Sequence, residues 1–123
     1  MKIAVIGGGP AGIMAAAAAS KNAEVILIEK NRKIGKKLFI TGKGRCNITN
    51  NCDKKEFLNN VVTNNKFLYS AINAFSPDDT INLLEKLGCP LKTERGGRVF
   101  PQSDKSSDVI AAFERYLHQC GVN

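Results

Sequence analysis

The sequence predicts an α/β fold, because its first 29 residues have the pattern of a strand, a glycine turn, a helix and a second strand. Two short apolar runs, residues 3–6 and 25–28, have the composition of parallel strands that are buried on both faces. Between them an alanine-rich segment follows Pro10, a residue that the first turn of a helix tolerates well. This order is that of a βαβ unit.

Three glycines in the turn, Gly7, Gly9 and Gly12, have the spacing G-x-G-x-x-G. Gly7 permits the tight turn, Gly9 opens the backbone to a pyrophosphate, and Gly12 lets the helix pack closely on the strand. Glu29 ends the second strand, near the position about 20 residues along at which this motif places a carboxylate on a ribose. The agreement of these elements predicts a dinucleotide-binding domain. The motif alone leaves both NAD and FAD open.

The composition is that of an ordinary globular protein, with 43% hydrophobic and 24% charged residues in a chain of 123. No stretch approaches the roughly 20 apolar residues of a membrane span, and no secretory leader precedes the first strand. We therefore expect a cytoplasmic protein that does not enter the membrane. The four cysteines form no C-x-x-C pair, and the sequence indicates no metal site. Cys46 and Cys52 are close enough for a flavin-linked disulfide, but two reduced thiols are the expected state.

Lysines and arginines crowd residues 30–45, and the formal net charge of the chain is +7. A basic cluster can bind nucleic acid, in which case the chain is a non-catalytic nucleotide- or RNA-binding module. No nucleic-acid-binding motif accompanies the cluster, and Phe39 is its only aromatic residue. Dinucleotide phosphates are already expected beside this segment, so nucleic acid is the less favoured partner.

Residues 30–52 are a second informative segment, which we predict to be a cofactor-binding loop. Long loops are uncommon unless they have a function, although a turn-rich connection that binds nothing is the alternative. Glycines let the backbone approach a ligand closely, and polar side chains supply hydrogen bonds. These residues are Gly35, Gly42, Gly44, Thr41, Arg45, Asn47 and Thr49.

Residues 53–123 are predicted to be mainly helical, with a short hairpin of residues 91–93 and 98–100. Four helices are expected, over residues 53–61, 66–75, 77–87 and from Ser106 to the residue before Gly121. No catalytic triad or pair of carboxylates can be assembled, so we name no catalytic residue. Two sets of apolar residues are predicted to face the core: Phe67, Ala71, Ala74 and Phe75, and Val109, Ile110, Phe113 and Leu117.

Four segments together resemble the bacterial HI0933-like flavoproteins, the BaiN or aminoacetone oxidase family of NAD(P)/FAD-dependent oxidoreductases. The segments are GGGPAGIMAA, IEKN, IGKKLFITGKGRCNITN and GGRVFPQSDKSSDVI, so the resemblance extends from the first strand to the last helix. Family members typically have glycine at the position of Lys43 and often arginine at that of Lys36. The resemblance implies a flavin-dependent oxidoreductase that transfers hydride between a small-molecule substrate and FAD, with NAD(P)H or oxygen as its partner.

The fingerprint and the resemblance together predict which residues bind the cofactor. The glycine turn and Glu29 follow from the fingerprint itself, whereas the contacts of the later loop are implied by the resemblance. The predicted set is Gly7, Gly9, Pro10, Ala11, Gly12, Glu29, Lys30, Lys37, Thr41, Gly42, Gly44, Arg45, Cys46 and Asn47.

The predicted fold is therefore the N-terminal part of a Rossmann-like, glutathione-reductase-like FAD-binding domain with a helical insertion and a short hairpin. We expect residues 1–123 to be a single, incomplete domain. It comprises the fingerprint (1–29), the cofactor loop (30–52) and the mainly helical segment (53–123). Only two strands of the parallel sheet are visible, and such a pair cannot be buried on both faces without further elements.

Overall fold

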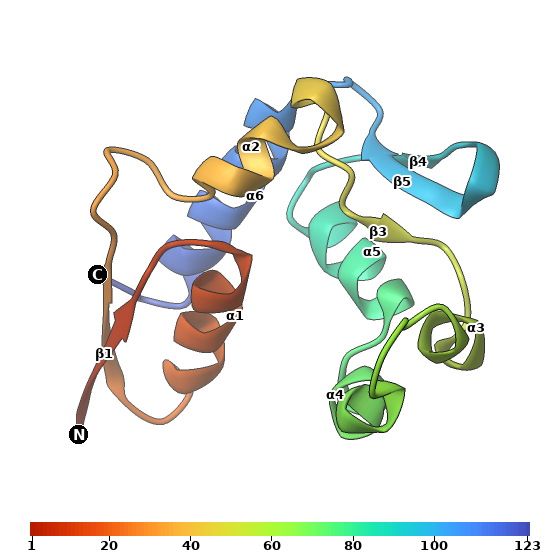
Figure 1. The fold of residues 1–123 in the computed structure, drawn as a ribbon. Coiled ribbons are helices and arrows are strands. Elements are labelled where there is room, and N and C mark those ends of the chain that lie inside the picture. Colours follow the sequence, from red (N-terminus) through yellow and green to blue (C-terminus); the bar gives the residue numbers. More distant parts are fainter.

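The computed structural model describes residues 1–123 and shows an α/β fold with two small sheets. In chain order the elements are β1 (Lys2–Ile6), α1 (Pro10–Ala19), β2 (Glu24–Ile28), α2 (Lys36–Ile40), the 3-10 turn η1 (Thr41–Gly44), β3 (Thr49–Asn50), α3 (Lys54–Asn59), η2 (Asn65–Leu68), α4 (Tyr69–Ala74), α5 (Pro77–Lys86), β4 (Leu91–Thr93), η3 (Arg95–Gly97), β5 (Arg98–Pro101) and α6 (Ser106–Gln119). In Figure 1, β1 and α1 lie on one side of the molecule, and the antiparallel sheet with α3, α4 and α5 lies on the other. Helix α6 contacts α1, α2, α5 and β5, so it joins the two sides.

The predicted βαβ unit is confirmed. Strands β1 and β2 are parallel and in register, with Lys2 opposite Glu24 and Ile6 opposite Ile28. Helix α1 buries Ile13 and two alanines on the side that faces this pair and α6. The small side chains of α1 allow the close approach of helix and strand that this unit needs.

The prediction that both strands are buried on both faces is wrong for the structure as it stands. Helix α1 covers one face of the pair, but on the other face Ile6 is 77% exposed, Ile26 42% and Ile28 49%. The edge of β2 is paired with Asn123, which donates to the carbonyl of Val25 (3.1 Å) and accepts from the N–H of Leu27 (2.7 Å). Asn123 thus bonds to two residues of β2 that are two positions apart, which is the hydrogen-bond pattern of parallel strands.

The segment predicted as an irregular cofactor loop contains helix α2, the turn η1 and strand β3. Gly35 precedes α2 in the left-handed region at φ 70°, where a β-carbon would lie 2.3 Å from Cδ1 of Ile110. Lysine and leucine are good helix formers, so the five residues after Gly35 take helical geometry once α6 packs against them. Because the segment is rich in glycine, it was predicted to be a loop, and this short helix was not predicted.

The predicted hairpin is confirmed, since β4 and β5 are antiparallel with Thr93 opposite Val99. Strand β3 also pairs with β5, with Thr49 opposite Val99, and so the sheet has the order β3-β5-β4. A strand of two residues has no periodicity for sequence analysis to detect. It nevertheless anchors residues 45–50 to the sheet.

The core is a cluster of 13 buried side chains at the junction of α1, β2, α5 and α6. Val109, Ile110, Phe113 and Leu117 are all buried, as predicted. By contrast, the prediction of a core face over residues 66–75 is wrong, because Phe67 is 80% and Phe75 40% exposed and no residue of α4 is buried. The segment is divided into a 3-10 turn and a short helix, so the single helical periodicity is lost.

The helices of this chain are too short or too polar for any of them to traverse a lipid bilayer.

Candidate cofactor site

A groove of about 710 Å³ opens where β1 and β2 end and the glycine turn begins. This is the carboxyl edge of a parallel sheet, at which open α/β domains bind their ligands. Six of the predicted cofactor residues line it: Gly7, Gly9, Pro10, Glu29, Lys30 and Lys37. The other lining residues are Ile6, Ile28, Asn31, Lys36 and Ile40, which sequence analysis did not include in the set.

The glycine turn has the geometry that the fingerprint requires. Gly7 has a positive φ of 100°, and its N–H donates to the carbonyl of Ile28 at 2.7 Å. A β-carbon on Gly12 would lie 1.8 Å from the carbonyl oxygen of Gly7, so only glycine fits where α1 crosses β1. A β-carbon on Gly9 would meet no protein atom within 4 Å, because this residue faces the groove.

The first turn of α1 has free hydrogen-bond donors. Helix α1 has no side-chain cap, and the N–H groups of Gly9, Ala11 and Gly12 make no hydrogen bond within the protein. Such donors at a helix N-terminus bind anionic oxygens. The turn therefore fits the pyrophosphate of a dinucleotide.

Glu29 is held rigidly at the entrance of the groove. Its Oε2 accepts from the N–H of Gly8 at 2.7 Å, and its Oε1 accepts from the N–H (2.7 Å) and side-chain amide (2.6 Å) of Asn31. These hydrogen bonds, first that of the Asn31 N–H and then that of Gly8, lower the pKa of the Glu29 carboxyl. Glu29 is therefore ionised at neutral pH and fixed in one orientation.

Asn31 is a residue that sequence analysis missed. Its signal was its position two residues after Glu29, a spacing at which short polar side chains form local turns. Gly8 was also missed as a partner of the carboxylate. A β-carbon there would lie 2.9 Å from Ile34 and 3.1 Å from Cβ of Glu29, so the donor must come from a residue without a side chain.

Three lysines, Lys30, Lys36 and Lys37, surround the groove and form no ion pair with any acidic residue. Their charge remains available to an anionic ligand. The groove thus combines the fixed carboxylate of Glu29 with three lysines that have no acidic partner.

The remaining loop residues of the predicted set do not line this groove. Arg45 instead forms ion pairs with Glu94 (2.5 Å) and Asp104 (2.7 Å), and its guanidinium lies 4.2 Å from the ring centre of Phe100. Cys46 is fully buried, and burial raises the pKa of its thiol to about 11. Arg45 and Cys46 thus attach the loop to the antiparallel sheet.

The other members of this group have local roles. The Thr41 hydroxyl donates to the carbonyl of Leu38 (2.8 Å), and a β-carbon on Gly42 would lie 3.1 Å from the backbone nitrogen of Asn47. Gly42, Lys43 and Gly44 all have positive φ angles. The structure therefore brings six residues of the predicted set together at the groove, whereas the predicted residues from Thr41 to Asn47 do not line it.

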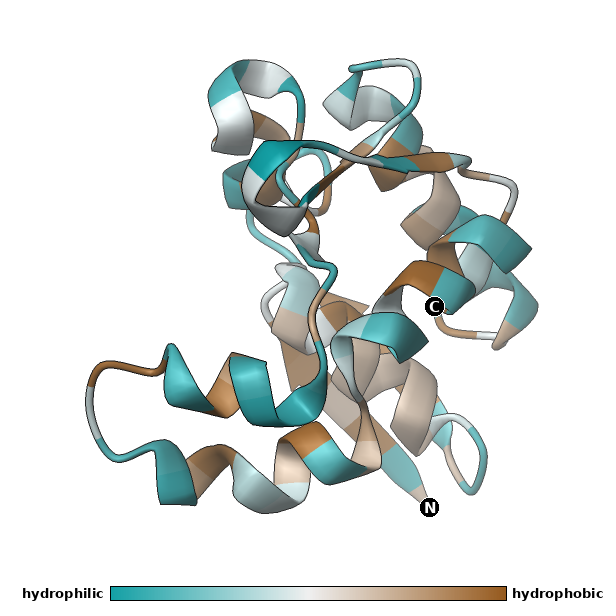
Figure 2. Ribbon diagram, turned by 90° about the vertical axis from the view of Figure 1, so that its right-hand side faces the viewer, coloured by the Kyte–Doolittle hydropathy of each residue, from teal (hydrophilic) through white to brown (hydrophobic).

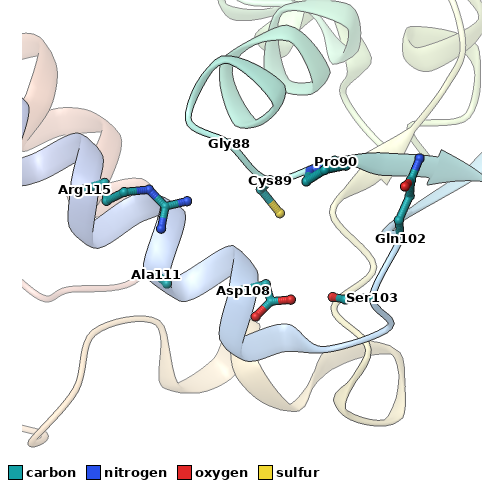
Figure 3. Close-up of a pocket in the computed structure, with 8 residues that line it drawn as sticks. All are labelled: Gly88, Cys89, Pro90, Gln102, Ser103, Asp108, Ala111 and Arg115. Carbon is teal, nitrogen blue, oxygen red and sulfur yellow. The ribbon is translucent and has the colours of Figure 1, made fainter.

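A separate cavity of about 520 Å³ lies between α6 and the turn after α5, and none of the predicted cofactor residues line it. Figure 3 shows the side chain of Cys89 pointing into this cavity from the turn after α5, opposite Arg115 and Asp108 of α6. Nε and Nη2 of Arg115 donate to the carbonyl of Leu87 at 3.0 and 2.6 Å. Arg115 thus closes the C-terminus of α5. All four cysteines of the chain are free thiols.

Comparison with known proteins gives relatives in two enzyme groups. The chain is 34% identical over 121 residues to the 3-dehydro-bile acid delta(4,6)-reductase of Clostridium scindens, with 96% of this chain and 29% of that protein covered. It is 34% identical over 98 residues to the ribosomal RNA dihydrouridine synthase of Escherichia coli, with 78% and 24% covered. The chain thus spans less than a third of the length of these curated relatives.

Among solved structures, the crystal structure of THI4 from Thermovibrio ammonificans has the same fold. The TM-score is 0.61 at 14% identity, and the match covers 99% of this chain and 36% of that one. The profile of the HI0933-like protein Rossmann domain matches residues 1–123, the whole of the described chain. The chain therefore belongs to the HI0933-like family, and its residues match the FAD-binding Rossmann domain of that family.

Proposed function

We propose that this chain is the FAD-binding part of a flavin-dependent oxidoreductase that reduces a carbon–carbon double bond conjugated with a carbonyl group. The names of both relatives support this reaction class. A delta(4,6) 3-dehydro steroid has its double bonds in conjugation with a ketone, and the synthesis of dihydrouridine saturates the pyrimidine double bond next to a carbonyl. Both relatives are named for reactions, so the alternative of a non-catalytic binding module is not favoured.

The observation that carries the proposal is the pairing of free N–H donors with a fixed carboxylate in one groove. The N–H groups of Gly9, Ala11 and Gly12 would hold the pyrophosphate of FAD, and Glu29 would accept hydrogen bonds from the ribose hydroxyls. Lys30 and Lys37 would balance the phosphate charge. When bound, the flavin supplies the hydride, and the protein supplies position and electrostatics.

The loop contacts are part of the same proposal. Residues 41–47 would lie along the extended cofactor beyond the groove, in a conformation fixed by the attachment of Arg45 to Glu94 and Asp104. A loop held by ion pairs and a buried cysteine presents its backbone without first having to be ordered, which favours binding.

A cytoplasmic location and NAD(P)H or oxygen as the redox partner also belong to the proposal. Four free thiols suit a reducing compartment.

We further propose that residues 1–123 are one incomplete domain, supported by the exposed isoleucines on the uncovered face of β1 and β2. In a longer protein that contains residues 1–123, further elements should cover this face. A cysteine introduced at Ile28 should then react slowly with a maleimide. Rapid labelling there would contradict this part of the proposal.

The test begins with the absorption spectrum of the purified protein and the identification of any nucleotide that denaturation releases. We expect a flavin spectrum and FAD. The protein is then reduced without oxygen by NADH or NADPH and mixed with a 4-en-3-one steroid or a uridine-containing oligonucleotide. Reoxidation of the flavin by either compound, but not by its saturated analogue, supports the reaction class. A flavin that only oxygen reoxidises, over a broad set of such enones, contradicts it.

A further inference from the structure

A second polar groove is lined by residues of α3, η2 and α4. Helices α3 and α4 lie on the side of the molecule away from β1 and α1 (Figure 1). The volume of the groove is about 440 Å³. Helices α3 and α4 lie side by side, and hydrophilic and apolar residues alternate along both (Figure 2). This groove shares no lining residue with the FAD groove, so its function is a separate question.

The charge in this groove is entirely positive. Lys54, Lys55 and Lys66 line it, no acidic residue does, and none of the three lysines forms an ion pair. The acidic residue of α3, Glu56, lines a different groove on the other face of that helix, with Cys52 and Phe57. An anionic ligand is therefore the occupant that the lysines favour.

The groove also has an exposed aromatic side chain and amides. Tyr69 lines the groove and is 63% exposed, while Phe67 of η2, which does not line it, is 80% exposed. Asn59, Asn65 and Asn73 complete the polar lining, and Asn65 and Asn73 each use their side-chain nitrogen on a backbone carbonyl. Their side-chain oxygens remain free to accept hydrogen bonds.

The side chains that line this groove are not part of the hydrophobic core. No residue between 51 and 75 is buried, and α3, η2 and α4 contribute no member to the core cluster. The segment is held mainly by its own hydrogen bonds, such as that from Lys54 Nζ to the carbonyl of Asn73. The side chains of Lys55, Lys66 and Tyr69 make no hydrogen bond within the protein, so they have no evident role in folding.

We propose that this groove binds a single-stranded nucleic acid. Unpaired lysines contact phosphates, and exposed aromatic side chains stack on bases that are free of a duplex, which is how single strands are bound without strict sequence preference. An apolar protein surface on this groove would desolvate three lysines that have no acidic partner, at a cost in free energy. The proposal concerns substrate or partner docking and does not depend on the reaction at the flavin.

The test is fluorescence anisotropy of the purified protein with fluorescein-labelled oligouridylate of 12 nucleotides, over a range of salt concentrations. The variant Lys55→Ala/Lys66→Ala should bind about ten-fold more weakly, and the slope of log K against log salt should fall by about 1.4, since each phosphate contact to a single strand contributes about 0.7. Tyr69→Ala should lose about ten-fold in affinity, whereas Tyr69→Phe should retain it, because stacking needs the ring and not the hydroxyl.

The matched control is Lys21→Ala/Lys86→Ala, which removes the same charge at exposed positions outside the groove. It should bind as the wild type does, and the flavin content should be equal in all variants. Tighter binding of oligouridylate than of oligodeoxyuridylate would identify RNA as the preferred strand. The proposal is overturned if the wild type binds neither strand at micromolar concentration, if the groove and control variants weaken equally, or if an acidic protein binds there instead.

Discussion

The carboxylate of Glu29 accepts a hydrogen bond from the backbone N–H of Gly8 at 2.7 Å, so the end of β2 is joined directly to the glycine turn. The two parts of the dinucleotide fingerprint are usually described by their separate contacts with a cofactor. In this chain they also contact each other, and Asn31 completes the arrangement with two further donors to the same carboxylate. The conformation of the site is therefore set before a ligand arrives.

Replacement of Glu29 by Gln should weaken FAD binding by about ten-fold or more, because a charge-assisted acceptor is lost. The amide nitrogen of Gln would also face one of the N–H donors of Gly8 or Asn31. Titration of the apoprotein with FAD, followed by flavin fluorescence, measures the change. Glu24→Gln is the control, since Glu24 lies at the other end of β2 in an exposed pair with Lys2. Equal affinities in the wild type and in Glu29→Gln would contradict the assigned role.

The stability difference between the wild type and Glu29→Gln should depend on pH. The hydrogen bonds of Asn31 and Gly8 lower the pKa of Glu29 below its ordinary value of 4.5. A lowered folded-state pKa contributes stability that is present above the ordinary value and is lost as pH falls through the folded-state value. Urea unfolding should therefore give a constant difference from pH 6 to 8 that shrinks below about pH 4.5. A difference that persists undiminished in acid, where Glu29 is protonated and resembles Gln, would exclude this explanation.

The glycine turn and Glu29 could be predicted from the sequence because the βαβ unit is formed by neighbouring residues of the chain. Each glycine of its motif is required for one steric reason. Gly12 has to be glycine because of the carbonyl of Gly7, and this requirement is readable from spacing alone. The exposure of Ile6 and Ile28 could not be predicted in the same way. An apolar run identifies a strand, but which of its faces other elements cover depends on tertiary structure.

The conformation of residues 41–47 could not be predicted because it depends on long-range contacts. Arg45 is joined to Glu94 and Asp104, 49 and 59 residues away, and no spacing rule connects them. The same holds for β3, whose two residues form a strand only because β5 presents a free edge. Phe67 and Phe75 failed as core residues because Asn64, at φ 52°, starts a 3-10 turn that breaks the helical phase.

Substitutions at two glycines of the fingerprint should have different effects, one on the stability of the fold and the other on the affinity for FAD. In Gly12→Ala the new methyl group would overlap the carbonyl of Gly7, 1.8 Å away, so the free energy of unfolding should fall by about 3 kcal/mol. In Gly9→Ala the methyl group meets no protein atom and φ is −76°, so stability should be unchanged. Gly9→Ala should nevertheless lose most of its FAD affinity, because the methyl group enters the space of the pyrophosphate. Thermal unfolding of the two apoproteins and FAD titration check this pair. Normal FAD binding by Gly9→Ala would place the pyrophosphate elsewhere.

Lys43 lies between Gly42 and Gly44 in the left-handed region, at φ 58°, where a side chain is strained. Lys43→Gly removes that strain but increases the entropy of the unfolded chain, so we expect a net gain of about 0.5 kcal/mol in the free energy of unfolding. Lys36→Gly, in the first turn of α2 rather than at a positive φ, is the matched control and should be destabilising. Chemical unfolding of the three proteins measures both changes. If Lys43→Gly and Lys36→Gly destabilise equally, the turn at Lys43 is more flexible than its backbone angle indicates, and the attachment of Arg45 and Cys46 does not fix the loop. If only Lys43→Gly is more stable than the wild type, the positive φ of this residue is a local strain that glycine relieves.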